Sequence, residues 1–375
     1  MGLAGFEHCA APVAVLAVVG IPAAVLWSAA EGGTPAAHPT TAPAFVGPPG
    51  AELKRHGDEI VVCGRFFHTT APVVLWIDPG GYDGYRLEKR FGPAGEPPDA
   101  PQTPAARYGI RDLSPEEARQ VREAGWDLPL LARKVDKLVI HYDGCGTSRQ
   151  CFRVLHDERG LSCHFLLDID GTIYQTLDLK ERAWHATKAN ARSIGIEIAG
   201  IGAHPPHASE PLQRWYAADA AGRVRIVPPQ GMDIAGVRTA GFVGRPARPE
   251  PVTGVIHGTL LRQYDFTPEQ YDSLIRLTAT LCVIFPSLRC DYPRDETGRL
   301  ITHVLTDEQL ERFSGILGHY HVQANKIDPG PAFQWDRLIE GARQILRDLS
   351  AAPATRPSAA TEPHSPHVSP SPPVR

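Results

Sequence analysis

The chain has 375 residues, with 38 Lys and Arg against 42 Asp and Glu, so its formal net charge is −4. This near balance of charge argues against a protein that binds nucleic acid through a basic surface. Hydrophobic residues make up 42% of the chain and charged residues 21%, which is typical of a globular protein and excludes wholesale disorder and a coiled coil.

An uncharged apolar segment occupies residues 9–30. It is long enough to span a bilayer, and the small residues Ser28 and Ala30 are placed as at a cleavage site before Glu31. The preceding residues contain no Lys or Arg, unlike the start of a usual signal peptide. We interpret residues 1–30 as a signal peptide, with an uncleaved membrane anchor or a buried helix as alternatives. The first two interpretations predict export, to the periplasm, the cell envelope or the medium, with membrane contact only if the segment is retained.

Composition predicts the organisation of the rest of the chain. Residues 31–55 form a Pro/Ala/Thr-rich linker, and residues 56–130 an N-terminal extension with strand-like runs and no evident chemistry. The main domain is expected at 131–349, interrupted by a Pro/Gly/Arg-rich insertion at 202–255. Residues 350–375 lack an apolar period and are expected to be a disordered tail.

Strands and helices alternate in the main domain. A strand is expected at 137–141, a helix at 148–158 and a hairpin at 164–178, followed by a strand at 193–198. Two acidic residues in the hairpin turn, at 168–171, suggest calcium, but the run lacks the remaining ligands of a calcium loop, so we favour a plain turn.

Helix starts are marked by capping boxes, in which a Ser or Thr is followed three residues later by Glu or Gln. These occur at Ser114, Thr267 and Thr306, and a last helix is expected at about 332–349. The pattern predicts an α/β fold with a central mixed β-sheet flanked by helices, carrying the N-terminal extension and the insertion.

Two places in the chain hold side chains suited to a metal. His141 ends an apolar strand, and His319 and Asp328 lie in a Pro-rich run that we expect to be a loop. Two histidines and a carboxylate leave one zinc position open to water, as in catalytic rather than structural sites. Glu197 lies on the polar face of an otherwise apolar strand and is a candidate base, and Lys326 is a candidate cation for an oxyanion. Taken singly, each residue has an ordinary structural explanation.

The order of these residues resembles the zinc-dependent N-acetylmuramoyl-L-alanine amidase family, which shares its fold with peptidoglycan recognition proteins. The resemblance is carried by five pieces in the family's order, VIHYDG (139–144), GLSCHFLLDIDGTIYQ (160–175), RAWHA (182–186), SIGIEI (193–198) and GHYHVQANKIDPGPAF (318–333). It implies zinc bound by His141, His319 and Asp328, and catalysis by Glu197 and Lys326.

The resemblance also implies roles for other residues. His185 falls where the family lines its substrate groove, and Cys145 and Cys151 resemble the short disulfide of peptidoglycan recognition proteins. His321 is a rival to His319, because the spacing from His319 to Asp328 is one residue shorter than we associate with cytoplasmic bacterial amidases. We favour His319 because a glycine precedes it.

Six cysteines remain outside the apolar leader, and spacing alone does not reveal their pairing. The short loops Cys145–Cys151 and Cys282–Cys290 are the natural candidates for disulfides, and free buried thiols are the alternative.

The resemblance leads us to expect an exported zinc amidase that cuts between N-acetylmuramic acid and L-alanine in peptidoglycan or its fragments. A non-catalytic peptidoglycan-binding module on the same fold is the alternative, and a zinc peptidase acting on another amide is a third hypothesis. Intact wall and released anhydro-muropeptides are both open as substrates.

Overall fold

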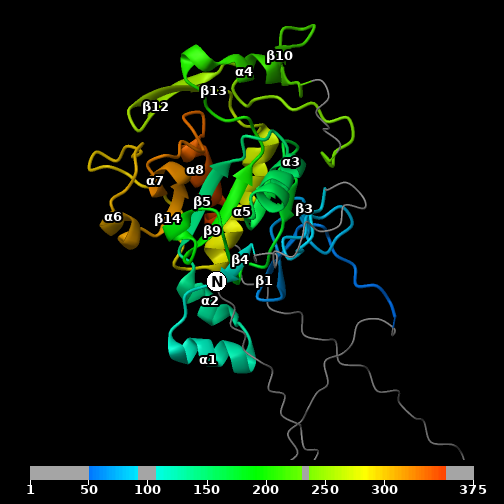
Figure 1. Cartoon of the computed structure of the whole chain (residues 1–375), viewed down its shortest axis with the longest axis vertical. Coiled ribbons are helices and arrows are strands. Elements are labelled where there is room, and N and C mark those ends of the chain that lie inside the picture. Colours follow the sequence, from blue (N-terminus) through cyan, green and yellow to red (C-terminus); the bar gives the residue numbers. More distant parts are fainter. Residues whose placement is uncertain (1–49, 92–106, 230–235, 352–375) are drawn as a thin grey trace, which may run out of the picture. The chain divides into compact units, whose positions relative to one another are not determined.

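A six-stranded mixed sheet lies at the centre of the computed structural model, which describes residues 50–91, 107–229 and 236–351 (Figure 1). The strands follow the order β14-β5-β9-β6-β7-β3. Their bounds are β3 (Val73–Leu75), β5 (Lys137–Tyr142), β6 (Phe165–Leu167), β7 (Ile173–Gln175), β9 (Ser193–Ile198) and β14 (Gly315–Gly318). Only β6 and β7 pair antiparallel, and every other neighbouring pair in the sheet is parallel.

Helices cover both faces of this sheet. Helices α5 (Pro268–Ile284) and α8 (Trp335–Ala351) pack together on one face, and α5 passes behind the strands in Figure 1. Helix α3 (Ser148–Phe152) and the π-helical turn that continues it, Arg153–Glu158, lie on the other face. The predicted α/β class is therefore confirmed.

Strand β9 shows how the sequence separates the two faces. Alternate side chains of a strand point to opposite sides, and the isoleucines 194, 196 and 198 are buried in the largest apolar cluster with α5 and α8. Ser193, Gly195 and Glu197 therefore face the α3 side. The functional residues considered below lie on that side.

The predicted capping boxes begin three helices. Ser114, Thr267 and Thr306 each accept a backbone N–H, and the side chain three residues on closes each box. The helices that follow are α1 (Pro115–Ala124), α5 and α6 (Asp307–Arg312). Local chemistry was sufficient to predict these starts.

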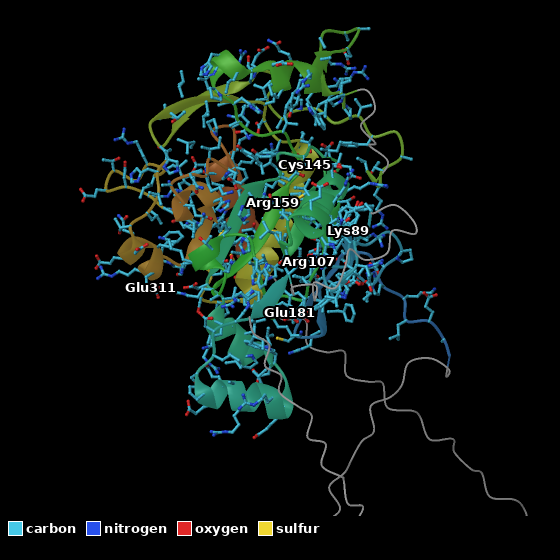
Figure 2. The ribbon with its side chains drawn as sticks, viewed as in Figure 1. Lys89, Arg107, Cys145, Arg159, Glu181 and Glu311 are labelled. Atoms are coloured by element: carbon cyan, nitrogen blue, oxygen red, sulfur yellow. The ribbon has the colours of Figure 1, made fainter. Side chains whose placement is uncertain are left out.

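The N-terminal segment contributes to the central sheet. Strands β1 (Glu59–Val62) and β2 (Arg65–His68) form a hairpin, and β3 pairs in parallel with β7 at the sheet edge. The Gln175 side chain accepts a hydrogen bond from the N–H of Val61 and donates one to its carbonyl. Arg107 (Figure 2) donates to three backbone carbonyls, those of residues 86, 87 and 156. The segment expected as an extension is thus joined to the main domain through backbone pairing and buried polar contacts.

Several further elements complete the described part of the fold, and of these only β11 lies on a run, 223–227, that is strand-like in the sequence. They are β4 (Tyr108–Ile110) paired with β8 (Glu181–Ala183), α2 (Leu128–Lys134), the 3-10 turns Thr187–Ala189 and Pro206–Ala208, α4 (Glu210–Trp215), the hairpin of β10 (Tyr216–Ala218) and β11 (Val224–Ile226), and the hairpin of β12 (Val252–Ile256) and β13 (Thr259–Gln263). Trp215 closes over Gly146, where a Cβ atom would lie 2.1 Å from the indole. The insertion is therefore seated on the α3 side of the domain.

Three sequence predictions concern regions that the structure does not describe, or describes only in small part. The apolar leader at residues 9–30, most of the linker at 31–55 and nearly all of the expected tail lie outside the described residues. Among the helices that are described, none combines the length and the apolar character needed to cross a bilayer.

Candidate metal centre

Parallel pairing brings three of the predicted residues to one edge of the sheet. His141 stands opposite Glu197 in the register of β5 and β9, at the carboxyl ends of both strands. Gly318 ends β14 opposite Ile140, so His319 follows directly beside His141. Carboxyl ends of parallel strands meet at the same edge, which is where α/β sheets commonly bind ligands.

Asp328 reaches this edge from the loop that follows. The run from 318 to 331 is not the continuous loop that we expected, because a short helix, α7 (His319–Val322), begins it. The chain then returns so that the Tyr320 N–H donates to the Asp328 carbonyl at 3.1 Å. A Cβ at Gly318 would lie 2.7 Å from Pro329, so this close approach requires the glycine.

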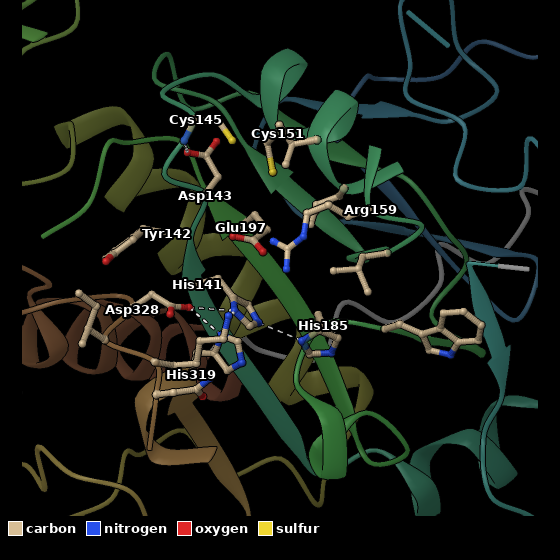
Figure 3. Close-up of a pocket in the computed structure, with 17 residues that line it drawn as sticks. His141, Tyr142, Asp143, Cys145, Cys151, Arg159, His185, Glu197, His319 and Asp328 are labelled. Atoms are coloured by element: carbon tan, nitrogen blue, oxygen red, sulfur yellow. Dashed lines mark hydrogen bonds and ion pairs between the residues drawn. The ribbon is translucent and has the colours of Figure 1, made fainter. Parts of the chain in front are cut away.

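The three side chains converge on one point. Nδ1 of His141 lies 2.9 Å from Nδ1 of His319, and each of these nitrogens lies 3.0 Å from Oδ2 of Asp328. All three residues are buried, and they form a possible metal-binding group among the described residues (Figure 3). Three such atoms sharing a small buried space could hold a metal ion.

The outer nitrogens, Nε2, of the His141 and His319 rings also have hydrogen-bond partners. Nε2 of His319 lies 2.7 Å from Oε1 of Gln323, an acceptor, so the ring proton belongs on Nε2 and the lone pair on Nδ1. Nε2 of His141 lies 2.9 Å from Nδ1 of His185. Two Nδ1 atoms and a carboxylate oxygen, with bonded outer nitrogens, fit a zinc ion with an open position.

His321 faces away from this group. It lies two residues after His319 on a helical turn, which places it on the opposite side of the helix. Its Nδ1 accepts the Gly318 N–H at 2.8 Å and its Nε2 lies 2.7 Å from the Ile301 carbonyl oxygen. Both ring nitrogens are used by backbone groups, so His319 rather than His321 belongs to the candidate metal centre.

A cavity of about 290 Å3 opens at the metal centre. Polar residues at its wall include Asp143, Arg159, Glu197 and Lys326, and Figure 3 shows the Arg159 guanidinium directed toward the Glu197 carboxyl group. Its apolar wall is formed by Val154, Leu155, Leu161 and Trp184. Arg159 and Asp143 were not predicted, because neither a periodic pattern nor a spacing marks them in the sequence.

Charged groups at the cavity have opposite effects on the pKa of Glu197. Burial raises the pKa of Glu197 well above its ordinary value, and the carboxylates of Asp328 and Asp143 add to this rise, whereas Lys326 and Arg159 reduce it. Burial also favours the neutral form of Asp328, but the close contacts of its carboxylate with His141 and His319 outweigh this effect and hold the pKa of Asp328 below its usual range. A carboxyl group with a raised pKa beside such a centre binds a proton more readily than an ordinary carboxylate, which suits a group that accepts and returns a proton.

Burial lowers the pKa of His141 to about 4, and the neighbouring His319 acts in the same direction. His185 shares the cavity wall, and burial together with the charge of His141 lowers its pKa well below the ordinary value. The rings of His141 and His185 are therefore neutral at pH 7. Neutral imidazole is the form that binds a metal.

The disulfide expected between Cys145 and Cys151 is not present in the structure, where all six cysteines of the described residues, including Cys282 and Cys290, are free thiols. Both Cys145 and Cys151 line the cavity. They pack in an apolar cluster with Phe152, and burial raises the pKa of both thiols. They act here as small apolar side chains.

The model of one protein family, described as N-acetylmuramoyl-L-alanine amidase, matches residues 131–331, more than half of the chain. The chain belongs to this family. The five sequence pieces that carried the resemblance extend from 139 to 333 and so fall almost entirely within the matched range. The predicted membership of the amidase family is therefore confirmed, and it supports a peptidoglycan amidase activity.

Several solved structures are similar to the chain. A selenomethionine derivative of AmpD is 17% identical over 62% of this chain and 93% of its own, with a TM-score of 0.28. AmiD from E. coli, in complex with the substrate anhydro-N-acetylmuramic acid-L-Ala-D-γ-Glu-L-Lys, is 19% identical over 62% of this chain and 65% of its own, with a TM-score of 0.30. The Ph2119 endolysin from a Thermus scotoductus bacteriophage is 14% identical over 56% and 84%, with a TM-score of 0.28. No curated protein matches the chain in sequence.

Proposed function

We propose that the protein is an exported zinc amidase that hydrolyses the amide between N-acetylmuramic acid and L-alanine in peptidoglycan or its fragments. The observation that carries the proposal is the convergence of His141, His319 and Asp328 beside Glu197, in a chain of the amidase family. Export rests on the apolar leader at residues 9–30.

The two histidines and Asp328 would hold the zinc ion, which when bound supplies Lewis-acid activation of water and of the scissile carbonyl. Glu197 accepts a proton from the attacking water through a carboxylate oxygen and returns it to the departing L-alanine nitrogen. The raised pKa of Glu197 makes its carboxylate a stronger base than an ordinary one. Lys326, on the cavity wall, brings a positive charge toward the oxygen that becomes anionic.

The apolar wall of the cavity offers a surface for the substrate. Trp184 and Leu161 would cover part of a bound muramyl peptide and exclude water from the scissile bond.

The direct test is Glu197→Ala in the full chain, assayed for new L-alanine amino groups released from purified sacculi and from anhydro-muropeptides. We expect turnover to fall by about 10²–10⁴-fold while one zinc ion per chain is retained. Glu123→Gln, at an exposed position on α1, is the control and should keep wild-type activity.

Two results would contradict the proposal in different ways. Wild-type turnover in Glu197→Ala would overturn the assignment of the base. If correctly folded wild-type protein holds no stoichiometric zinc, the alternative is favoured, a non-catalytic peptidoglycan-binding module.

A further inference from the structure

One face of β9 carries a gap between two polar side chains. Ser193, Gly195 and Glu197 point to the cavity side, and the middle position has no side chain. The ring of His185 fills this gap, because a Cβ at Gly195 would lie 2.6 Å from Nδ1 of His185. The imidazole thus lies against the backbone of β9, next to His141 on β5.

Hydrogen bonds fix the His185 ring at both nitrogens. Its Nδ1 lies 2.9 Å from Nε2 of His141, and its Nε2 lies 3.2 Å from Oγ of the fully buried Ser193. The planes of the His141 and His185 rings cross at 82°. The Asn190 side chain accepts the backbone N–H of His185 at 3.2 Å, so the main chain that carries the ring is held as well.

The proton positions follow from the role of His141. If Nδ1 of His141 gives its lone pair to zinc, the ring proton must lie on Nε2 and be donated to Nδ1 of His185. His185 must then carry its own proton on Nε2 and donate it to Ser193. This chain of donors, from His141 to His185 to Ser193, selects one tautomer of each ring.

We propose that His185 is a positioning residue: seated on Gly195 and anchored by Ser193, it holds the His141 imidazole in the orientation that presents Nδ1 to the metal. The inference rests on the proposed zinc function and gives His185 a role different from the substrate contact that the sequence suggested. Gly195 is then required because any larger side chain would displace the ring that orients a metal ligand.

Zinc affinity, measured on the full chain by competition with a chromophoric chelator, tests the proposal. His185→Phe fills the gap with a ring that has no nitrogen and should weaken zinc binding by about 10–100-fold. His185→Gln, whose amide can accept from His141 and donate to Ser193, should restore most of the affinity. Gly195→Ala removes no polar atom and should nevertheless weaken zinc binding, because its methyl group displaces the ring.

Gly200→Ala, just beyond β9, is the matched control, since its Cβ would meet Phe266 at an ordinary contact distance of 3.5 Å. Its zinc affinity should equal that of the wild type. The melting temperature of each metal-free variant separates a specific loss of zinc from a loss of fold.

The outcomes separate this inference from the proposed function. If the wild type holds no stoichiometric zinc, the proposed function fails, and with it the role of His185. If the wild type binds zinc and both His185→Phe and Gly195→Ala bind it equally tightly, the positioning role is overturned and the amidase proposal stands. A raised KM with unchanged zinc affinity in His185→Phe would likewise overturn positioning and identify a substrate contact.

Discussion

The buried carboxyl group of Asp168 should make the stability of the protein fall as the pH rises. Asp168 is completely buried in the turn between β6 and β7, where Oδ1 accepts the Ile169 N–H at 2.9 Å and Oδ2 has no hydrogen-bond partner. Burial raises the pKa of Asp168 to about 7, and the nearby charge of Asp170 contributes. We expect Asp168→Asn, which stays neutral and keeps the Oδ1 acceptor, to remove this pH dependence.

The sign and size follow from the two pKa values of Asp168. Between its unfolded pKa of about 3.9 and its folded pKa of about 7, the unfolded chain has lost a proton that the native state retains. Raising the pH therefore favours unfolding, and the contribution present at pH 4 is lost by pH 8. Three pKa units correspond to about 4 kcal/mol. The unpaired amide N–H groups of the variant cost about 1–3 kcal/mol at every pH. The change of unfolding free energy with pH is therefore a better test than its value at any one pH.

Urea unfolding followed by tryptophan fluorescence, at pH values from 4 to 8, measures the effect. The unfolding free energy of Asp168→Asn relative to wild type should rise by about 4 kcal/mol across this range. Asp170→Asn should flatten the pH dependence only in part, because it removes a charge that contributes to the raised pKa of Asp168 but leaves the buried carboxyl group in place. This variant also loses one of the two backbone N–H bonds that the carboxylate oxygens of Asp170 accept. Parallel stability curves for wild type and Asp168→Asn would refute the reasoning.

Two further predictions concern the metal centre and the base. His321→Ala should lower the unfolding free energy by about 2 kcal/mol, because the buried Gly318 N–H and the part-buried Ile301 carbonyl lose their partners, and it should keep one zinc per chain. His319→Ala should lose the zinc. Metal analysis together with urea unfolding distinguishes the two, and loss of zinc from folded His321→Ala would show that the wrong histidine was chosen. Activity should fall as the pH drops through the raised pKa of Glu197, and Arg159→Gln should move this acid limb to higher pH, because a cation that lowers the pKa of Glu197 is removed. Identical pH profiles of kcat/KM for wild type and Arg159→Gln would contradict the assignment.

Residues whose role depends on their own strand or helix could be predicted from the sequence. His141 at the end of an apolar strand and Glu197 among isoleucines both interrupt a local pattern, and each occupies the predicted strand in the structure. The helix start at Thr267 could likewise be predicted, because its capping box consists of four consecutive residues.

Relations between distant segments could not be predicted in this way. The contact of His185 with Gly195 depends on the path of the segment before β9, and the spacing of these residues in the sequence does not predict it. The choice between His319 and His321 required the short helix α7, which a Pro-rich run concealed. The sequence resemblance pointed to His319, which lies in the converging group, and only the three-dimensional contacts explain why His321 lies outside it.

The edge strand β3 sets a practical limit on shortening this enzyme. The family match begins at residue 131, yet a chain trimmed to that point would leave the outer edge of β7 without its parallel neighbour. Gln175 would lose both hydrogen bonds to Val61, and a newly bare strand would be available for pairing with other molecules. Fragments prepared for crystallisation or for activity assays should therefore start ahead of β1, or they will be prone to aggregate.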